Sequence, residues 1–351
     1  MTALHDLPAQ DLLAAYRQRT LSPVEVTQAV LAHMARWEPH IRATYLLRPE
    51  HALAQARQSE ARWQRGEPQG LLDGVPVTIK ENIATQGDPT PLGTAAVPLV
   101  PAAADAPPAA RLREAGAVMV AKTTMPDYGM LSSGLSSFHP LSRNPWDVSK
   151  GPGGSSAGGG AAAAAGYGPL HIGTDIGGSL RLPASWCGIF SLKPSLGRIP
   201  IDPPYTGRAA GPMTRTVQDA ALMMQVLSQP DARDSMSLPY QPIAWGEYDQ
   251  SVQRLRGLRL GLLLDAGCGL PVEAEVRAAV EHAARLFEQA GAQVSLMQPF
   301  MTQAMLDGMD HFWRMRSYTD LQALPEAQRA KVLPYIRAWA ESAAGMTGTQ
   351  V

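Results

Sequence analysis

The chain has 351 residues, of which 45% are hydrophobic and 17% charged, and its formal net charge is −1 at pH 7. This composition is too apolar for a disordered chain, and a charge so close to zero excludes the basic surface with which proteins bind nucleic acid or anionic membranes. Two cysteines are too few for a disulfide framework, and no apolar run reaches the length of a membrane span or fits a signal peptide. We therefore expect a cytoplasmic protein that contacts neither nucleic acid nor membrane.

Residues 1–66 predict a layer of helices. Apolar side chains recur at near-helical spacing over residues 7–18. Ser22 opens a capping box, in which a serine caps the first turn and a glutamate three positions later reaches back to the serine N–H. Pro39 marks the expected end of this second helix, because proline breaks the backbone hydrogen-bond ladder. A third, alanine-rich helix is expected over residues 49–65.

Short strands and helices alternate in the rest of the chain. Val75–Lys80 is a β-branched run that ends in a lysine, and Val118–Ala121 follows a helix and a glycine. Leu170–Gly173 follows an alanine-rich helix, and residues 258–297 read as strand, helix and strand. This alternation is typical of an α/β layered fold, and the last segment predicts a βαβ unit.

A stretch rich in glycine and serine carries the candidate chemistry. It contains Gly153-Gly154-Ser155-Ser156-Ala157-Gly158 and, further on, Gly173-Thr174-Asp175-Ile176-Gly177-Gly178-Ser179-Leu180-Arg181. Ordered glycine costs conformational entropy, so this density indicates backbone that closely approaches another group. Ser155 and Ser179 each follow a Gly-Gly pair, where free N–H groups suit a developing oxyanion. Because serine needs a neighbouring base to become a nucleophile, the stretch predicts a serine nucleophile in a site built from glycine.

These blocks resemble those of the amidase signature family. Gly153 to Gly158 matches the family's Gly-Gly-Ser-Ser-Gly-Gly, with alanine in place of one glycine, and Gly173 to Arg181 matches Gly-Thr-Asp-(Ile/Thr)-Gly-Gly-Ser-Ile-Arg, with leucine in place of isoleucine. Gly74 to Lys80 matches Gly-Val-Pro-Val-x-Ile-Lys, which holds the family's catalytic lysine. The spacing between Ser155 and Ser179 is also the family's. The resemblance implies an amidase-signature-type α/β/α layered fold, in which helices cover a central mixed β-sheet.

The resemblance also implies a Ser–cis-Ser–Lys mechanism. Ser179 would attack the amide carbonyl and form an acyl-enzyme. Ser155, in the family's cis-peptide position, would take the proton from Ser179 and pass it to the leaving nitrogen, and Lys80 would accept a proton from Ser155. An enclosed Lys80 can be neutral near pH 7, because burial disfavours the charged ammonium.

Further residues are expected around these three. The backbone N–H groups that would form the oxyanion hole are those of Ile176, Gly177, Gly178 and Ser179. Gly129 and Met130 would line the acyl pocket, although Met130 fits ordinary core packing equally well. Ser156 would orient the two serines by hydrogen bonding. Asp175 and Arg181 would either pin the nucleophile loop or contact the substrate.

Other catalytic patterns fit less well. Residues 154–158 match the nucleophile elbow of α/β-hydrolases, centred on Ser156, but the residues just before them are polar where that fold has a hydrophobic strand. The later histidines available to such a site are His171, His282 and His311. No serine stands three residues before a lysine, no Gly-Lys-Ser/Thr follows the glycines, and the eight histidines form no metal-binding motif. We expect no metal and no cofactor.

Within the family, the sequence favours a stand-alone amidase that cleaves a small carboxamide or aryl amide as its substrate. The runner-up is the A subunit of a glutamine-dependent tRNA amidotransferase, which requires partner subunits. Such subunits commonly have Arg-Gln-Pro-Ala after the nucleophile, where this chain has Arg181 to Ala184 with a leucine in place of glutamine. A catalytically silent protein on this scaffold is a third class, and the three retained catalytic residues argue against it. A homodimer stays open.

We expect one amidase domain over residues 1–351. It comprises the helical layer at 1–66, a catalytic core at 67–228, and a βαβ and helical part at 255–351. Members of the family usually continue further, so this last part is expected to be incomplete.

Overall fold

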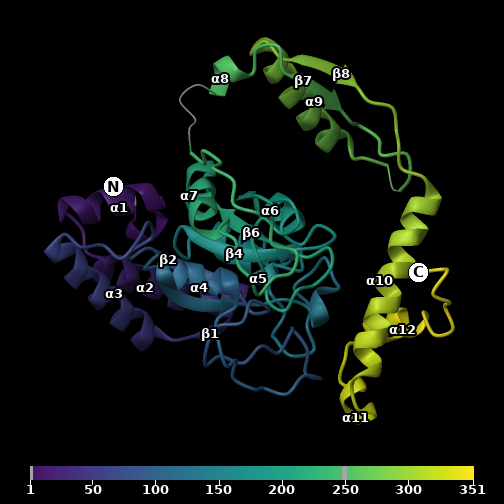
Figure 1. Ribbon diagram of the computed structural model, residues 1–351, viewed down its shortest axis with the longest axis horizontal. Coiled ribbons are helices and arrows are strands. Elements are labelled where there is room, and N and C mark those ends of the chain that lie inside the picture. The colour runs from purple at the N-terminus through teal and green to yellow at the C-terminus, as the bar shows by residue number, and fades with distance from the viewer. Residues whose placement is uncertain (1–2, 247–250, 270) are drawn as a thin grey trace. The chain divides into compact units, whose positions relative to one another are not determined.

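The structure is a computed structural model that describes residues 3–246, 251–269 and 271–351 (Figure 1). Its contacts divide the chain into two compact units. The larger unit comprises residues 1–245 together with 326–336, and the smaller one comprises 246–325 together with 337–351. The single amidase domain expected from the sequence stays a prediction.

A six-stranded mixed sheet forms the centre of the larger unit (Figure 1). Its strands are β1 (Thr44–Leu47), β2 (Pro76–Lys80), β3 (Val118–Thr123), β4 (Leu170–Asp175), β5 (Phe190–Ser191) and β6 (Ala209–Thr214). The order in the sheet is β1-β3-β2-β4-β6-β5. β2 runs parallel to both of its neighbours, whereas the pairs β1–β3, β4–β6 and β5–β6 are antiparallel. The mixed sheet confirms the predicted fold class and places Lys80 at the end of an interior strand.

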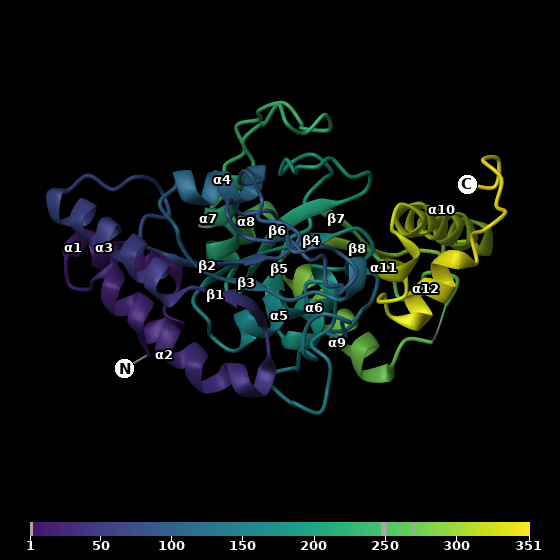
Figure 2. The same ribbon diagram turned by 90° about the horizontal axis from the view of Figure 1, so that it is seen from below.

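The larger unit also contains helices, several of which pack against the sheet. They are η1 (Leu4–Asp6), α1 (Ala9–Gln18), α2 (Pro23–Ile41), α3 (Pro49–Arg65), α4 (Pro107–Glu114), η2 (Asp127–Gly129), α5 (Ala157–Ala164), α6 (Arg181–Cys187), α7 (Val217–Leu227) and α11 (Glu326–Arg329). Figures 1 and 2 show α1 to α3, in purple, grouped at one side of the sheet, and α5 contacts β2, β3, β4 and β6. Side chains such as Leu12, Val30, Ile79, Ile172 and Met223 are buried between these layers, and their removal from water is the main stabilising contribution.

The N-terminal layer differs from the expectation in two places. The predicted capping box at Ser22 is present, because the Ser22 Oγ accepts the Val24 N–H and the Ser22 N–H donates to the Glu25 carboxylate. Pro39 does not end α2, which continues to Ile41; the proline costs one backbone hydrogen bond near the end of the helix, and the helix stops two residues later. The layer also contains β1, a strand of four residues that was not predicted.

The smaller unit contains α8 (Ser251–Arg254), β7 (Arg259–Leu262), α9 (Ala274–Gln289), β8 (Gln293–Leu296), α10 (Gln303–Gln322) and most of α12 (Pro334–Glu341). β7 and β8 are parallel, so the predicted βαβ unit is confirmed. α9 has no buried side chain among those described, and it exposes Val276, Val280, Leu286 and Phe287.

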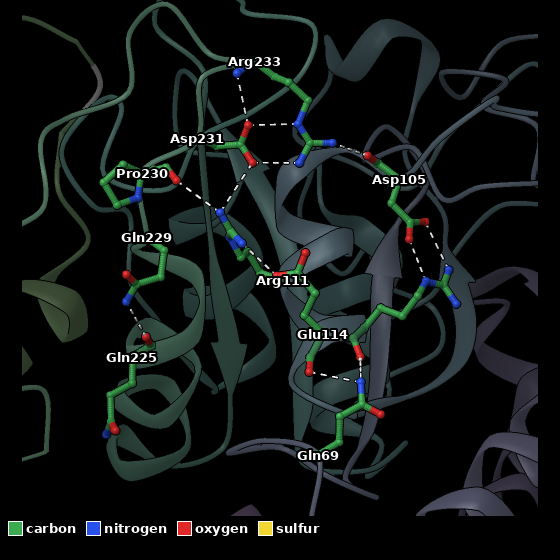
Figure 3. A network of polar contacts seen from close by, with 10 residues as sticks. Gln69, Asp105, Arg111, Glu114, Gln225, Gln229, Pro230, Asp231 and Arg233 are labelled. Carbon is green, nitrogen blue, oxygen red and sulfur yellow. Dashed lines mark hydrogen bonds and ion pairs between the residues drawn. The ribbon is translucent and has the colours of Figure 1, made fainter.

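A network of ion pairs holds the segment that follows α7 against α4 and the residues just before it (Figure 3). The Asp231 carboxylate lies 2.7 Å from Arg233 Nη2 and 3.7 Å from Arg111 Nη2. Arg111 also donates to the Pro230 carbonyl, and Arg233 donates to the carbonyl of Asp105 at 2.9 Å. Because these groups share partners, the network holds a segment that has little regular structure of its own.

The described residues contain neither a membrane-spanning helix nor a cluster of metal-binding side chains. None of the helices within residues 3–246, 251–269 and 271–351 combines the length and apolarity that crossing a membrane requires. The same residues hold no group of three or more His, Cys, Asp or Glu side chains placed to bind a metal ion.

Candidate active site

Lys80 is the centre of a buried hydrogen-bond cluster. It is the last residue of β2, and none of its surface is exposed. Its Nζ lies 2.8 Å from Ser155 Oγ, 3.0 Å from Ser156 Oγ and 3.0 Å from Thr174 Oγ1. Because β2 is an interior strand with β4 beside it, the ends of these two strands bring Lys80 and Thr174 together. The structure thus joins the lysine and two of the serines that the sequence singled out.

The environment of Lys80 favours the neutral amine. Burial lowers the pKa of Lys80 to about 7, and the positive charge of Arg208 acts in the same direction. The carboxylates of Glu81 and Asp175 raise this pKa and oppose the shift only in part. A lysine with such a pKa has a large neutral fraction at neutral pH and can accept a proton from a hydroxyl group.

Glycines let the serine loop lie directly against neighbouring backbone. The peptide bond between Gly154 and Ser155 is cis, and Ser155 is 4% exposed. A Cβ on Gly154 would collide with the backbone of Leu131 and Ser133. In α5, which starts two residues after Ser155, a Cβ on Gly158 would collide with backbone in the same way. The close approach predicted from the glycine density is therefore present, and it fixes the position of Ser155.

Asp175 organises the loop that carries Ser179. It ends β4 with 1% of its surface exposed, and its carboxylate accepts the N–H groups of Gly178 at 2.8 Å and Leu180 at 3.0 Å. Arg181 binds the same carboxylate through Nε at 3.0 Å and Nη2 at 2.8 Å. Burial raises the pKa of Asp175, but the hydrogen bonds from Arg181, Leu180 and Gly178 outweigh it and hold the pKa below its usual range.

Ser179 lies at the turn into α6 and is half-buried. Its carbonyl accepts the Ser156 N–H at 3.1 Å, which links the Ser179 loop to the serine loop through the backbone. The Ser156 side chain contacts β4, since its Oγ donates to the Thr174 carbonyl at 3.1 Å. A Cβ on Gly173 would lie 2.6 Å from Ser156 Oγ, so this glycine makes room for the contact.

The remaining predicted residues surround this cluster. A Cβ on Gly129 would lie 3.1 Å from Ser155 Oγ, so Gly129 borders the serine directly. Met130 follows it and is half-buried. Of the expected oxyanion donors, Gly178 already donates its N–H to Asp175, and an oxyanion would have to share that donor. The pocket and oxyanion roles of all these residues stay predictions.

Two residues of the cluster were not identified from the sequence. Thr174 Oγ1 accepts a hydrogen bond from Lys80 Nζ, and Asn82 Nδ2 donates to the same Oγ1 at 3.0 Å. Thr174 lies inside the block Gly173 to Arg181, and this membership was the signal that could have identified it. Asn82 carried no local signal, because its contact depends on the pairing of β2 with β4.

His171 does not take part in this cluster. Its Nδ1 lies 2.8 Å from Thr78 Oγ1 and its Nε2 lies 3.1 Å from the Gly168 carbonyl. Burial, together with the positive charge of Arg215, lowers the pKa of His171 to about 3. Ser156 instead contacts Lys80 and Thr174, which disfavours the nucleophile-elbow interpretation centred on that serine.

The chain was compared with known sequences. A family model described as "Amidase" matches residues 25–333. The A subunit of the glutamyl-tRNA(Gln) amidotransferase of Chloroflexus aggregans is 39% identical over 313 residues, which are 87% of this chain and 63% of the relative. The same subunit of a Picosynechococcus species is 36% identical over 302 residues, 84% of this chain and 60% of the relative. The chain thus spans about 60% of the length of these relatives.

Solved structures also match this chain in fold. A bacterial aryl acylamidase of the amidase signature enzymes matches with a TM-score of 0.89 and 29% identity, over 99% of this chain and 74% of that chain. A 6-aminohexanoate cyclic dimer hydrolase bound to its substrate matches with a TM-score of 0.86 and 26% identity, again over 99% and 74%. The peptide amidase of Stenotrophomonas maltophilia matches with a TM-score of 0.83 and 27% identity, over 98% and 76%.

Proposed function

Because this chain belongs to the amidase signature family, we propose that it hydrolyses the carbon–nitrogen bond of a small carboxamide or aryl amide through a serine acyl-enzyme. The proposal rests on the buried contact between Lys80 Nζ and Ser155 Oγ, which lie 2.8 Å apart. The pKa of this lysine is lowered to about 7. A neutral amine beside a hydroxyl is a general base in position.

The proposed reaction uses Ser179 as nucleophile. As Ser179 Oγ bonds to the amide carbon, its proton moves to Ser155 Oγ, and the Ser155 proton moves to Lys80 Nζ. When the tetrahedral intermediate collapses, the carbon–nitrogen bond breaks, Ser155 gives a proton to the leaving nitrogen, and Lys80 returns its proton to Ser155. Water then attacks the ester along the same proton path and releases the acid, which restores Ser179.

The oxyanion of the intermediate would be held by the N–H groups of Ile176, Gly177 and Ser179, and by Gly178 in competition with Asp175. Asp175 would act by fixing the loop that carries these donors. A preorganised donor lowers the barrier because no reorganisation is needed when charge develops, and one such donor contributes about 3–4 kcal/mol in well-studied hydrolases.

Labelling with a fluorophosphonate, read by intact mass, tests the proposal. The parent chain should gain one adduct, Ser179→Ala should gain none, and Lys80→Ala should label slowly. Ser149→Ala is the matched control, because Ser149 is exposed and lies outside the cluster. A folded parent that takes no label would refute the hydrolase and favour the catalytically silent class. Label that persists in Ser179→Ala would place the nucleophile on another serine.

A second candidate is the A subunit of a glutamine-dependent tRNA amidotransferase. The identity of 39% to subunits of that name favours it, whereas Leu182, in place of the glutamine common after the nucleophile in those subunits, favours the stand-alone enzyme. A glutaminase assay on the chain alone and on any co-purifying subunits separates the two. Glutamine hydrolysis that appears only with such subunits would establish the second candidate. A cytoplasmic location and a homodimer stay predictions.

A further inference from the structure

A cavity of about 290 Å³ is lined by residues of β2 and β3 and of the neighbouring segments, and none of its lining residues belongs to the serine cluster. Ile79 of β2 and Lys122 of β3 line it, and these two residues are partners in the register of the parallel pair. Successive residues of a strand point to opposite faces, so Lys80, which follows Ile79, points the other way. The cavity is therefore separate from the candidate active site.

Lys122 is a buried ammonium at the wall of this cavity. It is 3% exposed, and its Nζ donates to the carbonyl of Ile83. Within the part of the chain that the structure describes, no carboxylate pairs with Lys122. Burial lowers the pKa of Lys122 to about 8, although the more distant carboxylates of Asp88, Glu81 and Asp105 raise it. At neutral pH the Lys122 ammonium is therefore mostly charged, and no carboxylate of the described residues is in contact with it.

Two guanidinium groups line the same cavity. Arg48 Nη2 lies 2.6 Å from an Asp88 carboxylate oxygen, and Arg113 binds Asp105 through Nε at 2.6 Å and Nη2 at 3.1 Å. A guanidinium has five N–H donors, so each arginine can bind a second anion beside its first.

The start of α3 adds positive potential to the cavity. α3 begins at Pro49, directly after Arg48, so the positive end of its helix dipole lies next to that arginine, with Glu50 as the one acidic side chain of its first turn. His51, in that turn, also lines the cavity. Arg48 and Arg113 are paired with Asp88 and Asp105, so Lys122 supplies the cationic charge of the cavity that has no carboxylate in contact among the residues described.

We propose that this cavity binds a small phosphate monoester, with the phosphate between Lys122 and the guanidinium groups of Arg48 and Arg113. Phosphate carries up to two negative charges, and forked arginine donors suit its oxygens. The volume lies near the lower end for small-molecule sites, which limits the ester to a compact organic group. Binding at this site requires no hydrolase activity, so its test is independent of the test of the proposed function.

Glycerol 3-phosphate is the probe, and thermal unfolding and isothermal titration calorimetry of the full chain are the measurements. The parent should gain thermal stability with the probe, since a ligand that binds only the folded state stabilises it. Lys122→Met and Arg48→Met should each weaken binding by about tenfold or more, the loss expected for one charge-assisted hydrogen bond. Arg48 is half-exposed, so this second variant keeps the test valid if Lys122→Met folds poorly. Arg57→Met, on the exposed side of α3, should bind like the parent.

Proton uptake on binding distinguishes a ligand beside Lys122 from one bound elsewhere on the surface. A phosphate beside Lys122 favours its charged form, so binding at pH 8 should take up as much as about half a proton. Calorimetry in two buffers of different ionisation enthalpy measures this uptake, and Lys122→Met should abolish it. Equal stabilisation of all variants, or no stabilisation of the parent, would overturn the site. Succinate or inorganic phosphate binding more tightly than the probe would overturn the ligand class.

Discussion

Replacing Lys80 by methionine should stabilise the protein more at pH 6 than at pH 9. Burial lowers the pKa of Lys80 from its ordinary 10.5 to about 7. At pH 6 the ammonium is charged in both the folded and the unfolded chain, so the folded state carries the full desolvation cost. Between pH 7 and pH 10.5 the unfolded chain binds more protons than the folded one, and stability rises with pH. Methionine has no charge to desolvate and removes this dependence.

The magnitude follows from the two pKa values. Integrated from pH 6 to pH 9, the shift at Lys80 adds about 2–3 kcal/mol to the free energy of unfolding of the parent and nothing to that of Lys80→Met. Other titrating groups contribute to both proteins and cancel in the comparison. Urea unfolding at the two pH values, followed by circular dichroism, measures the difference.

Lys150→Met is the matched control, because Lys150 is exposed, and its effect should be equal at both pH values. If Lys80→Met and the parent respond to pH in parallel, within about 0.5 kcal/mol, then Lys80 does not lose its proton in the folded state near neutral pH. Lys80 then could not serve as the proton acceptor at pH 7, and the proposed proton transfer from Ser155 to Lys80 would be excluded. The pH profile of kcat/KM should agree, with activity rising through about pH 7 as Lys80 becomes neutral.

Three further changes probe the site and its scaffold. Arg208→Met removes a cation that lowers the pKa of Lys80, so the acid limb of kcat/KM should move to higher pH; an unchanged limb would contradict this coupling. Gly158→Ala would press a Cβ into a backbone carbonyl and should cost about 1–3 kcal/mol in thermal unfolding, whereas Gly151→Ala, with open space around it, should cost little. Ser22→Ala removes the cap of α2 and should lower the free energy of unfolding by about 1 kcal/mol in urea; no loss would mean that water replaces the cap.

Local patterns predicted much of the larger unit correctly. The helix over residues 49–65 and the strand that ends at Lys80 follow from spacing and from β-branched residues, and both are confirmed. The capping box at Ser22 is equally local, since all its groups lie within one turn. β1, β5 and β6 were not predicted. β1 and β5 have only four and two residues, too short for a pattern, and residues 200–211 read as a polar loop; all three strands exist through their pairing with neighbouring strands.

The amino-acid sequence alone was enough to identify the family, through blocks that need glycine for close backbone approach and serine and lysine for proton transfer. It also indicated that Lys80, Ser155 and Ser156 matter, although they lie in blocks 75 residues apart. The groups that surround Lys80, in contrast, follow from the fold. Asn82 and Thr174 come together because β2 pairs with β4, and burial at the end of an interior strand lowers the Lys80 pKa. Hydrogen bonds and desolvation depend on distances through space, and a linear pattern does not contain them.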